Sequence, residues 1–203
     1  MSETDHRRPA AIGVWEHNGW AVAVAIGVEV GEPVILDRRR LDLLSDGLPQ
    51  QPYQHDTINM PDVEAQALVD RVRADAMARA KVALQALVDD LDADTWRIDV
   101  LTLREPAWPD LPTSVAEVHA NQRALHVADG MIYHDAVVSA AAERGLEIVF
   151  FHKNDVLSIC CDRLDCSAHE LEEILLQFGK EVGSPWQKEH QMAAAGAIDA
   201  LFR

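Results

Sequence analysis

Three cysteines and a histidine stand close together in the sequence and could bind a soft metal ion. Cys161, Cys166 and His169 carry the sulfur and imidazole ligands that zinc prefers, and Cys160 is adjacent. The set lacks a clear fourth ligand, and Ser167 is better explained as a helix cap. Buried free cysteines are also common. The sequence therefore leaves open whether the region from Cys160 to His169 holds a metal ion.

Motifs for several other kinds of chemistry are missing from the sequence. It contains no glycine-rich phosphate loop, no nucleophile elbow and no dinucleotide fingerprint. Nothing in it supports nucleotide hydrolysis or hydride transfer. The remaining histidines stand in no recognised zinc spacing; they include His119, His126, His134, His152 and His190.

One carboxylate near the end of the sequence stands among small residues. On a helix, Asp199 would share a face with Met192, Ala195 and Gly196, which permit close approach to a neighbouring element. A carboxylate that is buried in such a place needs a partner, either a metal ion or an arginine. The sequence leaves both alternatives open, together with an exposed position.

The elements that must position these residues begin with short strands. Residues 11–16, 20–28 and 33–40 are rich in apolar residues, and turn-forming residues separate them at Asn18-Gly19 and at Gly31 to Pro33. We expect a three-stranded antiparallel meander. Proline and glycine then predict a loop over 42–61.

Helices and strands alternate after this loop. Apolar residues recur every three or four positions over 62–91, which predicts one long helix, and 96–103 reads as a strand. A capping box of Ser114 and Glu117 predicts a second helix that ends at Gly145, before a buried strand over 146–151. Two strands joined in this way lie parallel and cross over with a right hand.

Two further capping boxes predict the last helices. Ser167 with Glu170 begins one that should end near Gly179, and Ser184 with Gln187 begins another. The whole order, three strands followed by helix, strand, helix, strand and two helices, predicts an α/β protein with a mixed five-stranded sheet.

Composition and charge restrict the partners. The 203 residues, 48% hydrophobic, suggest a single domain over 11–203, preceded by a flexible polar arm over 1–10. The formal charge of −16 repels a phosphate backbone and disfavours a nucleic-acid partner, although Arg38, Arg39 and Arg40 form a local basic cluster. Because there is no membrane span and no signal peptide, we expect a cytoplasmic protein without a membrane partner.

Four short motifs stand in the same order as in a known protein family. They are Ile12-Gly13-Val14 with Gly19-Trp20-Ala21-Val22, Leu103-Arg104-Glu105, the run AAAERGLEIV over 140–149, and the run AIDAL over 197–201. With the order of strands and helices, they resemble the RuvC-type Holliday-junction resolvases of the ribonuclease H-like superfamily over most of the chain. The resemblance implies a mixed five-stranded sheet, three antiparallel strands and then parallel strands, flanked by helices.

The resemblance also implies a chemistry. In that family, acidic residues from separate elements hold two divalent ions, Mg²⁺ or Mn²⁺, which activate a water and stabilise the leaving oxygen of a phosphodiester. The family's glutamate falls on Glu105 and its last aspartate on Asp199, so these two would be catalytic metal ligands. Its other helix aspartate falls on Gly196, and its first-strand aspartate falls on Trp15.

Two of the four acidic positions thus depart from the family pattern. Trp15 would form a wall of the site, and Glu16 or Asp99 are the candidate substitute acids. Glu16 points to the opposite face of its strand, so it could replace an acid at position 15 only with a bulge. Two hypotheses stay open: a metal-dependent endonuclease on DNA or RNA, and a catalytically inactive scaffold that binds a protein partner or itself. The resemblance also implies a homodimer.

Overall fold

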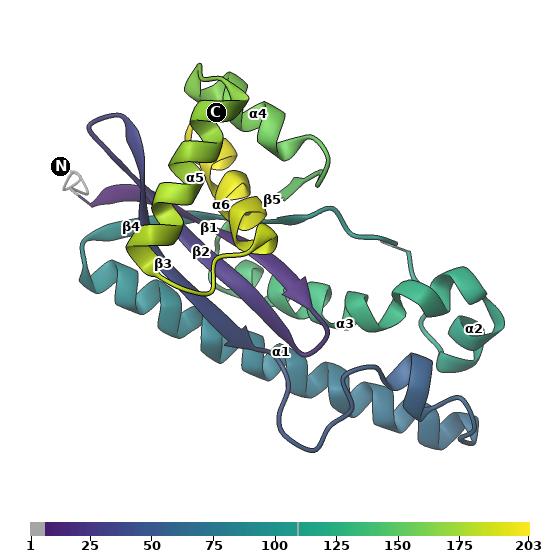
Figure 1. The fold of residues 1–203 in the computed structure, drawn as a ribbon. Helices are drawn as coiled ribbons and strands as arrows, with labels where there is room; N and C mark the ends of the chain where they lie inside the picture. Colours follow the sequence, from purple (N-terminus) through teal and green to yellow (C-terminus); the bar gives the residue numbers. More distant parts are fainter. Residues whose placement is uncertain (1–6, 109) are drawn as a thin grey trace.

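Three antiparallel strands form one half of a mixed sheet (Figure 1). The computed structural model describes residues 7–108 and 110–203. Gly19 and Gly31 take positive φ angles of 84° and 86° in the two turns, a conformation that glycine adopts without steric cost. The predicted meander is therefore confirmed. Its strands are β1 (Arg8–His17), β2 (Trp20–Glu29) and β3 (Glu32–Asp42).

The first strand begins earlier than the sequence predicted. Arg8, Pro9 and Ala10, assigned to a flexible arm, belong to β1 and pair with the strand that starts at Trp96. Long-range pairing stabilises this segment, and its local polarity gives no sign of that. The rest of the expected arm, residues 1–6, lies outside the described residues.

Two parallel strands complete the sheet in the order β3-β2-β1-β4-β5. β4 (Trp96–Arg104) pairs parallel to β1, and β5 (Glu147–Phe151) pairs parallel to β4. The helix α1 (Asp62–Ala93) connects β3 to β4 after an excursion that includes one π-helical turn, Pro52–Asp56. The five-stranded mixed sheet is thus confirmed.

Helices cover both faces of this sheet (Figure 1). On one face, α1 and α3 (Gln122–Glu143) enclose the larger core, which includes the fully buried Ile12, Val14 and Leu101. On the other face, α5 (Ala168–Val182) and α6 (Lys188–Leu201) enclose a second core. None of the helices in the described part of the chain is both long and apolar enough to cross a membrane.

The second predicted helix is interrupted. Asn121 is extended, with φ −121° and ψ 102°, and separates α2 (Val115–Ala120) from α3. Its side chain accepts hydrogen bonds from the backbone N–H groups of Arg123 and Ala124, which makes it the N-cap of α3. The local competition between this cap and a continuous helix was not recognised in the sequence.

The C-terminal helices also differ from the prediction. A further helix, α4 (Val156–Leu164), precedes α5, whose capping box of Ser167 and Glu170 is confirmed. α5 continues past Gly179 to Val182, so Gly179 is not its C-cap. The absent side chain at Gly179 instead makes room for the indole of Trp186. α6 begins after Gln187, which is its N-cap in place of the predicted Ser184.

Helix α6 lies unusually close to the sheet. A Cβ atom on Gly13 of β1 would stand 1.8 Å from the carbonyl oxygen of Ala193. On the facing side of the helix, a Cβ on Gly196 would stand 2.7 Å from the ring of Phe151 and 2.8 Å from Thr102 Oγ1. Small residues on both partners are therefore required for this packing.

Candidate site at the carboxyl ends of β1 and β4

Trp15 lies at the position where the resemblance places a metal-binding aspartate. Its ring packs against Phe151 with a centroid distance of 6.5 Å. The guanidinium of Arg104, from the end of β4, lies over the same ring at 4.5 Å from its centroid. Such a cation over an indole face is attracted by the ring quadrupole. The end of β1 therefore carries a fixed positive charge next to an aromatic surface.

Glu16 is buried beside this pair. It is 7% exposed, and its Oε1 accepts a hydrogen bond of 2.8 Å from Arg104 Nη2 and lies 3.4 Å from His134 Nδ1 on α3. Burial raises the pKa of Glu16, but the hydrogen bond with His134 and the charge of Arg104 outweigh it, so the pKa is lowered overall. Glu16, one of the two candidate substitute acids, is thus paired with Arg104 and His134.

A pocket of about 200 Å³ opens next to these side chains. Glu105 lies at its mouth with an exposed side chain, while its backbone N–H donates to the carbonyl oxygen of Phe151 at 3.0 Å. The structure therefore brings Glu105 and Glu16 to one pocket. The lining also includes His17, Asn18, Gln54, Arg104, His126 and His134.

Asp199 has a different environment. It lies on α6, is 14% exposed, and accepts a hydrogen bond of 3.1 Å from Arg163 of α4. It does not line the pocket that contains Glu105. Of the two partners that the sequence allowed for a buried carboxylate here, the structure shows an arginine. The structure does not join Asp199 to Glu105 through a shared pocket.

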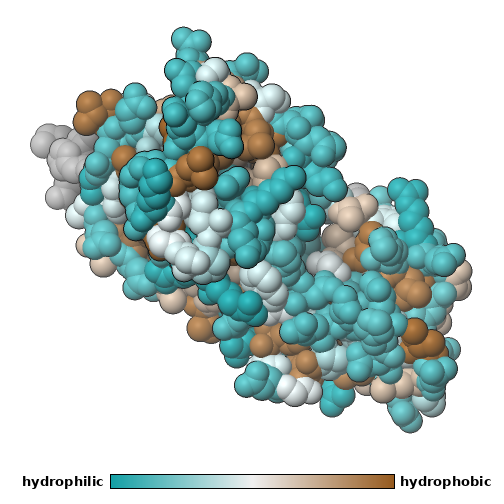
Figure 2. Space-filling view, viewed as in Figure 1, coloured by the Kyte–Doolittle hydropathy of each residue, from teal (hydrophilic) through white to brown (hydrophobic). Residues whose placement is uncertain are grey.

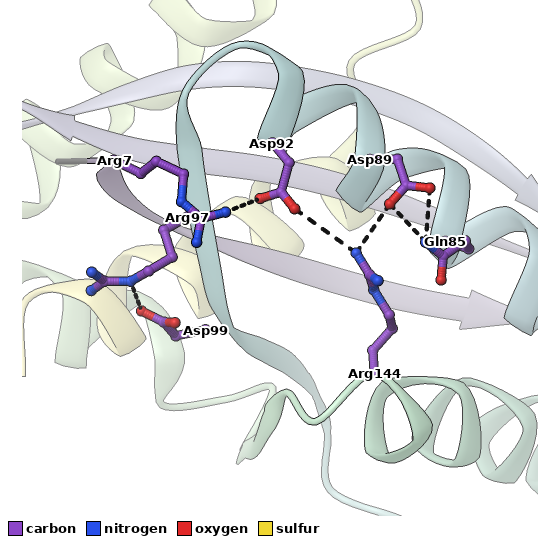
Figure 3. A network of polar contacts seen from close by, with 7 residues as sticks. All are labelled: Arg7, Gln85, Asp89, Asp92, Arg97, Asp99 and Arg144. Atoms are coloured by element: carbon purple, nitrogen blue, oxygen red, sulfur yellow. Dashed lines mark hydrogen bonds and ion pairs between the residues drawn. The ribbon is translucent and has the colours of Figure 1, made fainter. Parts of the chain in front are cut away.

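Asp99 stands apart from the site. It is an exposed residue in the first half of β4 and accepts a hydrogen bond of 2.7 Å from Arg97. Figure 3 shows this pair near the end of α1, next to the network in which Asp92 meets Arg7 and Arg144. Asp99 therefore belongs to a surface charge network, and β4 carries Glu105 at its other end.

The cysteine region forms packing and hydrogen-bond contacts. Cys160 is buried and donates a hydrogen bond to the carbonyl oxygen of Ala195, and burial raises its pKa to about 12. His169 is exposed and lies 3.7 Å from Glu173 on the same helix. Cys160 therefore contributes to packing between helices, and His169 lies on a solvated helix face.

The donor set at this strand end is short of what two divalent ions require. Hard cations take several oxygen ligands. Trp15 and Gly196 supply none, Asp199 and Glu16 are each paired with an arginine, and the guanidinium of Arg104 lies at the end of β1. Over residues 7–108 and 110–203, no three acidic, histidine or cysteine side chains are grouped as a metal site would need. The residues in place do not fit a two-ion centre.

A buried aspartate that the sequence analysis missed positions one wall of the pocket. Asp129 of α3 is fully buried and accepts hydrogen bonds from the backbone N–H groups of Tyr53 and Gln54 at 2.9 and 3.2 Å. Burial raises its pKa to about 6. An acidic residue between the apolar positions Ala128 and Met131 was the signal that could have revealed it.

Comparison with known proteins gives a match in structure alone. No family model and no curated protein matches the chain. The RuvC structure from Thermus thermophilus aligns over 95% of this chain and 93% of its own, with a TM-score of 0.50 and 12% identity. The chain has a ribonuclease H-like fold.

Two other solved structures align less well. T. thermophilus RuvC in complex with a Holliday junction substrate covers 95% of this chain and 92% of its own, with a TM-score of 0.49 and 13% identity. An Aquifex aeolicus PPX-GPPA enzyme covers 78% of this chain and 41% of its own, with a TM-score of 0.38 and 10% identity.

Proposed function

We propose that this ribonuclease H-like chain is a scaffold that binds a protein partner and does not cut nucleic acid. The observation that carries the proposal is the position of Arg104, whose guanidinium lies over Trp15 and pairs with Glu16. A fixed cation at this strand end repels a divalent ion, and Asp199 is occupied by Arg163. The net charge of −16 also opposes binding to a phosphate backbone.

A metal-dependent endonuclease on DNA or RNA is the second candidate, since two observations favour it. Glu105 is exposed at the end of β4, where the resemblance places a catalytic glutamate, and it lines the same pocket as Glu16. Glu16 Oε2 is buried and has no hydrogen-bond partner among the described residues. With Mg²⁺ or Mn²⁺, Glu105 and Glu16 would be the carboxylate ligands that this pocket supplies, provided that Arg104 moved away.

A cleavage assay separates the two candidates. The chain is incubated with branched DNA, linear DNA and RNA in Mg²⁺ or Mn²⁺, beside T. thermophilus RuvC on the branched substrate as a positive control. We expect no product, and no rise in melting temperature when either ion is added, because the donor set does not fit.

Two variants make the assay decisive. Glu105→Gln and Asp199→Asn remove one carboxylate each. Cutting by the native chain that is lost in Glu105→Gln would refute the scaffold proposal and establish the nuclease. Cutting that persists undiminished in both variants would indicate a contaminating nuclease. Light scattering on the same samples distinguishes a monomer from the homodimer that the resemblance implies.

A further inference from the structure

A groove with an apolar floor lies between α4 and α5, outside the pocket described above. Its volume is about 550 Å³, within the range of about 300–1,000 Å³ that is usual for ligand sites. Leu157 and Cys161 of α4 face Leu171 and Leu175 of α5 across it. A left-handed turn at Asp165 ends α4 and leads the chain into α5, so that the two helices form the two sides of the groove.

Large apolar side chains remain exposed on the two helices that form this groove. Leu157 is 38% exposed, and Leu176, on the outer face of α5, is 49% exposed. In Figure 2, hydrophobic side chains show among hydrophilic ones in the upper part of the molecule, where Figure 1 draws α4 and α5. Contiguous apolar surface with a polar rim is typical of a docking surface.

The groove is lined by two acidic side chains, and the segment that forms it has an acidic excess. Residues 155–182 contain seven acidic side chains and two basic ones, Arg163 and Lys180, and Arg163 is already paired with Asp199. Two of the acidic residues, Asp162 and Glu172, line the groove itself. The other five are Asp155, Asp165, Glu170, Glu173 and Glu181. A partner with complementary charge is therefore basic.

We propose that the α4–α5 groove binds an amphipathic basic helix of a partner protein. Its apolar side chains, spaced three and four residues apart, would contact Leu157, Leu171 and Leu175, and its lysines or arginines would lie near Asp162 and Glu172. The inference rests on the proposed scaffold function and names the partner's chemistry. A second copy of the chain fits less well, because each copy carries a net charge of −16.

Model peptides test the groove directly. A fluorescent peptide of about 14 residues with one leucine face and one lysine face is compared with two controls. One control has glutamate in place of lysine, and the other has the same composition in an order without an apolar face. In fluorescence anisotropy, we expect the first peptide to bind at least about tenfold more tightly than either control, and binding to weaken between about 50 and about 300 mM NaCl.

Variants locate the binding site. Leu157→Asn removes an exposed apolar contact and Glu172→Lys reverses a rim charge, so each should weaken binding about tenfold. Glu64→Lys makes the same charge change at an exposed position of α1 and should leave affinity unchanged. Melting temperatures of all three variants establish that they are folded.

Three outcomes would overturn the groove proposal. They are no binding of the lysine peptide, equal binding of the control peptide that has the same composition without an apolar face, and an unchanged affinity of Leu157→Asn for the lysine peptide. The equal binding would show general attraction to an acidic protein. None of these results depends on nuclease activity. If the chain cuts DNA and the peptide still binds at the groove, the scaffold function fails while the groove stands, so the two proposals fail separately.

Discussion

Arg104 is the residue on which the local structure of the site depends. It contacts the indole of Trp15 through its guanidinium and the carboxylate of Glu16 through Nη2, so it joins two neighbouring residues that point to opposite faces of β1. Glu16 is buried, and a buried carboxylate that loses its cationic partner strongly destabilises the folded protein. The interaction can therefore be measured through protein stability.

Arg104→Met should lower the free energy of unfolding by about 2 kcal/mol, because it leaves Glu16 buried with only His134 nearby. The value is below that of a fully buried pair, since the Arg104 side chain is 32% exposed. Adding Glu16→Gln to this variant should recover part of the loss, as the uncompensated charge disappears. Urea unfolding of the single and double variants measures both effects.

The matched control is an exposed ion pair. The side chains of Lys81 and Glu143 are 63% and 49% exposed. Lys81→Met breaks their contact and should lower the free energy of unfolding by about 0–1 kcal/mol. If Arg104→Met costs no more than Lys81→Met, Arg104 does not hold Glu16 in the way described.

Asp129 should make stability depend on pH. Its pKa is raised by burial to about 6 in the folded chain, above the usual value of about 3.9 for an unfolded aspartate. The folded state therefore binds the proton of Asp129 more tightly than the unfolded state does. The stability that this proton contributes is complete below pH about 4 and is lost as the pH rises through about 6. Asp129→Asn cannot titrate and should lack this loss.

Chemical unfolding of both proteins between pH 4 and pH 7 tests the prediction. The stability of the native chain relative to Asp129→Asn should fall with rising pH by on the order of 2 kcal/mol. Other groups, such as Glu16, titrate in both proteins and cancel in the difference. A difference that is flat or rises with pH would contradict the account of Asp129.

Sequence reasoning identified some of the residues at the site and missed others. Trp15 and Glu105 could be placed at strand ends, because strand boundaries follow from local apolar patterns. The pairing of Glu16 with His134 and of Asp199 with Arg163 could not, since each joins residues far apart in the chain. Those pairings decide whether a carboxylate is available for a metal ion.

At the scale of elements, Arg38 fixes the end of α5 to the sheet. From β3, its Nη2 lies 3.3, 3.4 and 3.2 Å from the carbonyl oxygens of Val182, Gly183 and Ser184. The last carbonyls of a helix have no partners within the helix, and a cation there also interacts favourably with the helix dipole. Arg38 therefore links the α5–α6 connection to the opening meander.

Arg38→Ala should lower the free energy of unfolding by about 1–2 kcal/mol and loosen this connection locally. Arg38→Lys keeps the charge without the planar fork and should recover less than the full effect. Hydrogen exchange followed by mass spectrometry should show faster exchange over residues 180–188 in Arg38→Ala, with α1 unchanged. Equal exchange in the native and Arg38→Ala proteins would show that the carbonyls do not need this cation.

The elements themselves were predicted better than their ends. The meander, the long α1 and the parallel strands follow from period and turn chemistry, and Gly19, with its positive φ in the first turn, is an example. The break at Asn121 and the start of α6 at Gln187 depend on which of several capping side chains wins, and Ser184 was wrongly chosen. Between Ser184 and Gln187, the indole of Trp186 fills the space left by Gly179, a tertiary contact that the local sequence does not reveal.

At the scale of the whole molecule, charge is the dominant property. The formal net charge is −16, and many of the described acidic residues lie on the surface, including those of the α4–α5 groove. A compact protein with such an excess repels itself, and salt screens the repulsion. The charge therefore affects both stability and the choice of partner.

The melting temperature should rise by a few degrees between about 20 and about 500 mM NaCl at neutral pH, because screening relieves this repulsion. Calorimetry at both salt concentrations checks the prediction. A melting temperature that falls with NaCl at neutral pH would mean that attractive ion pairs outweigh the net repulsion.

The close packing of α6 limits how this chain could evolve. An aspartate at Gly196 would collide with Phe151 and Thr102, and Phe151 in turn packs against Trp15. An acidic residue at position 15 or 196 would thus require a compensating change at Phe151, since a single substitution would leave a cavity beside Phe151 or a collision with it. Acidic residues at positions 15 and 196 are therefore open to this chain only through coupled substitutions that include Phe151.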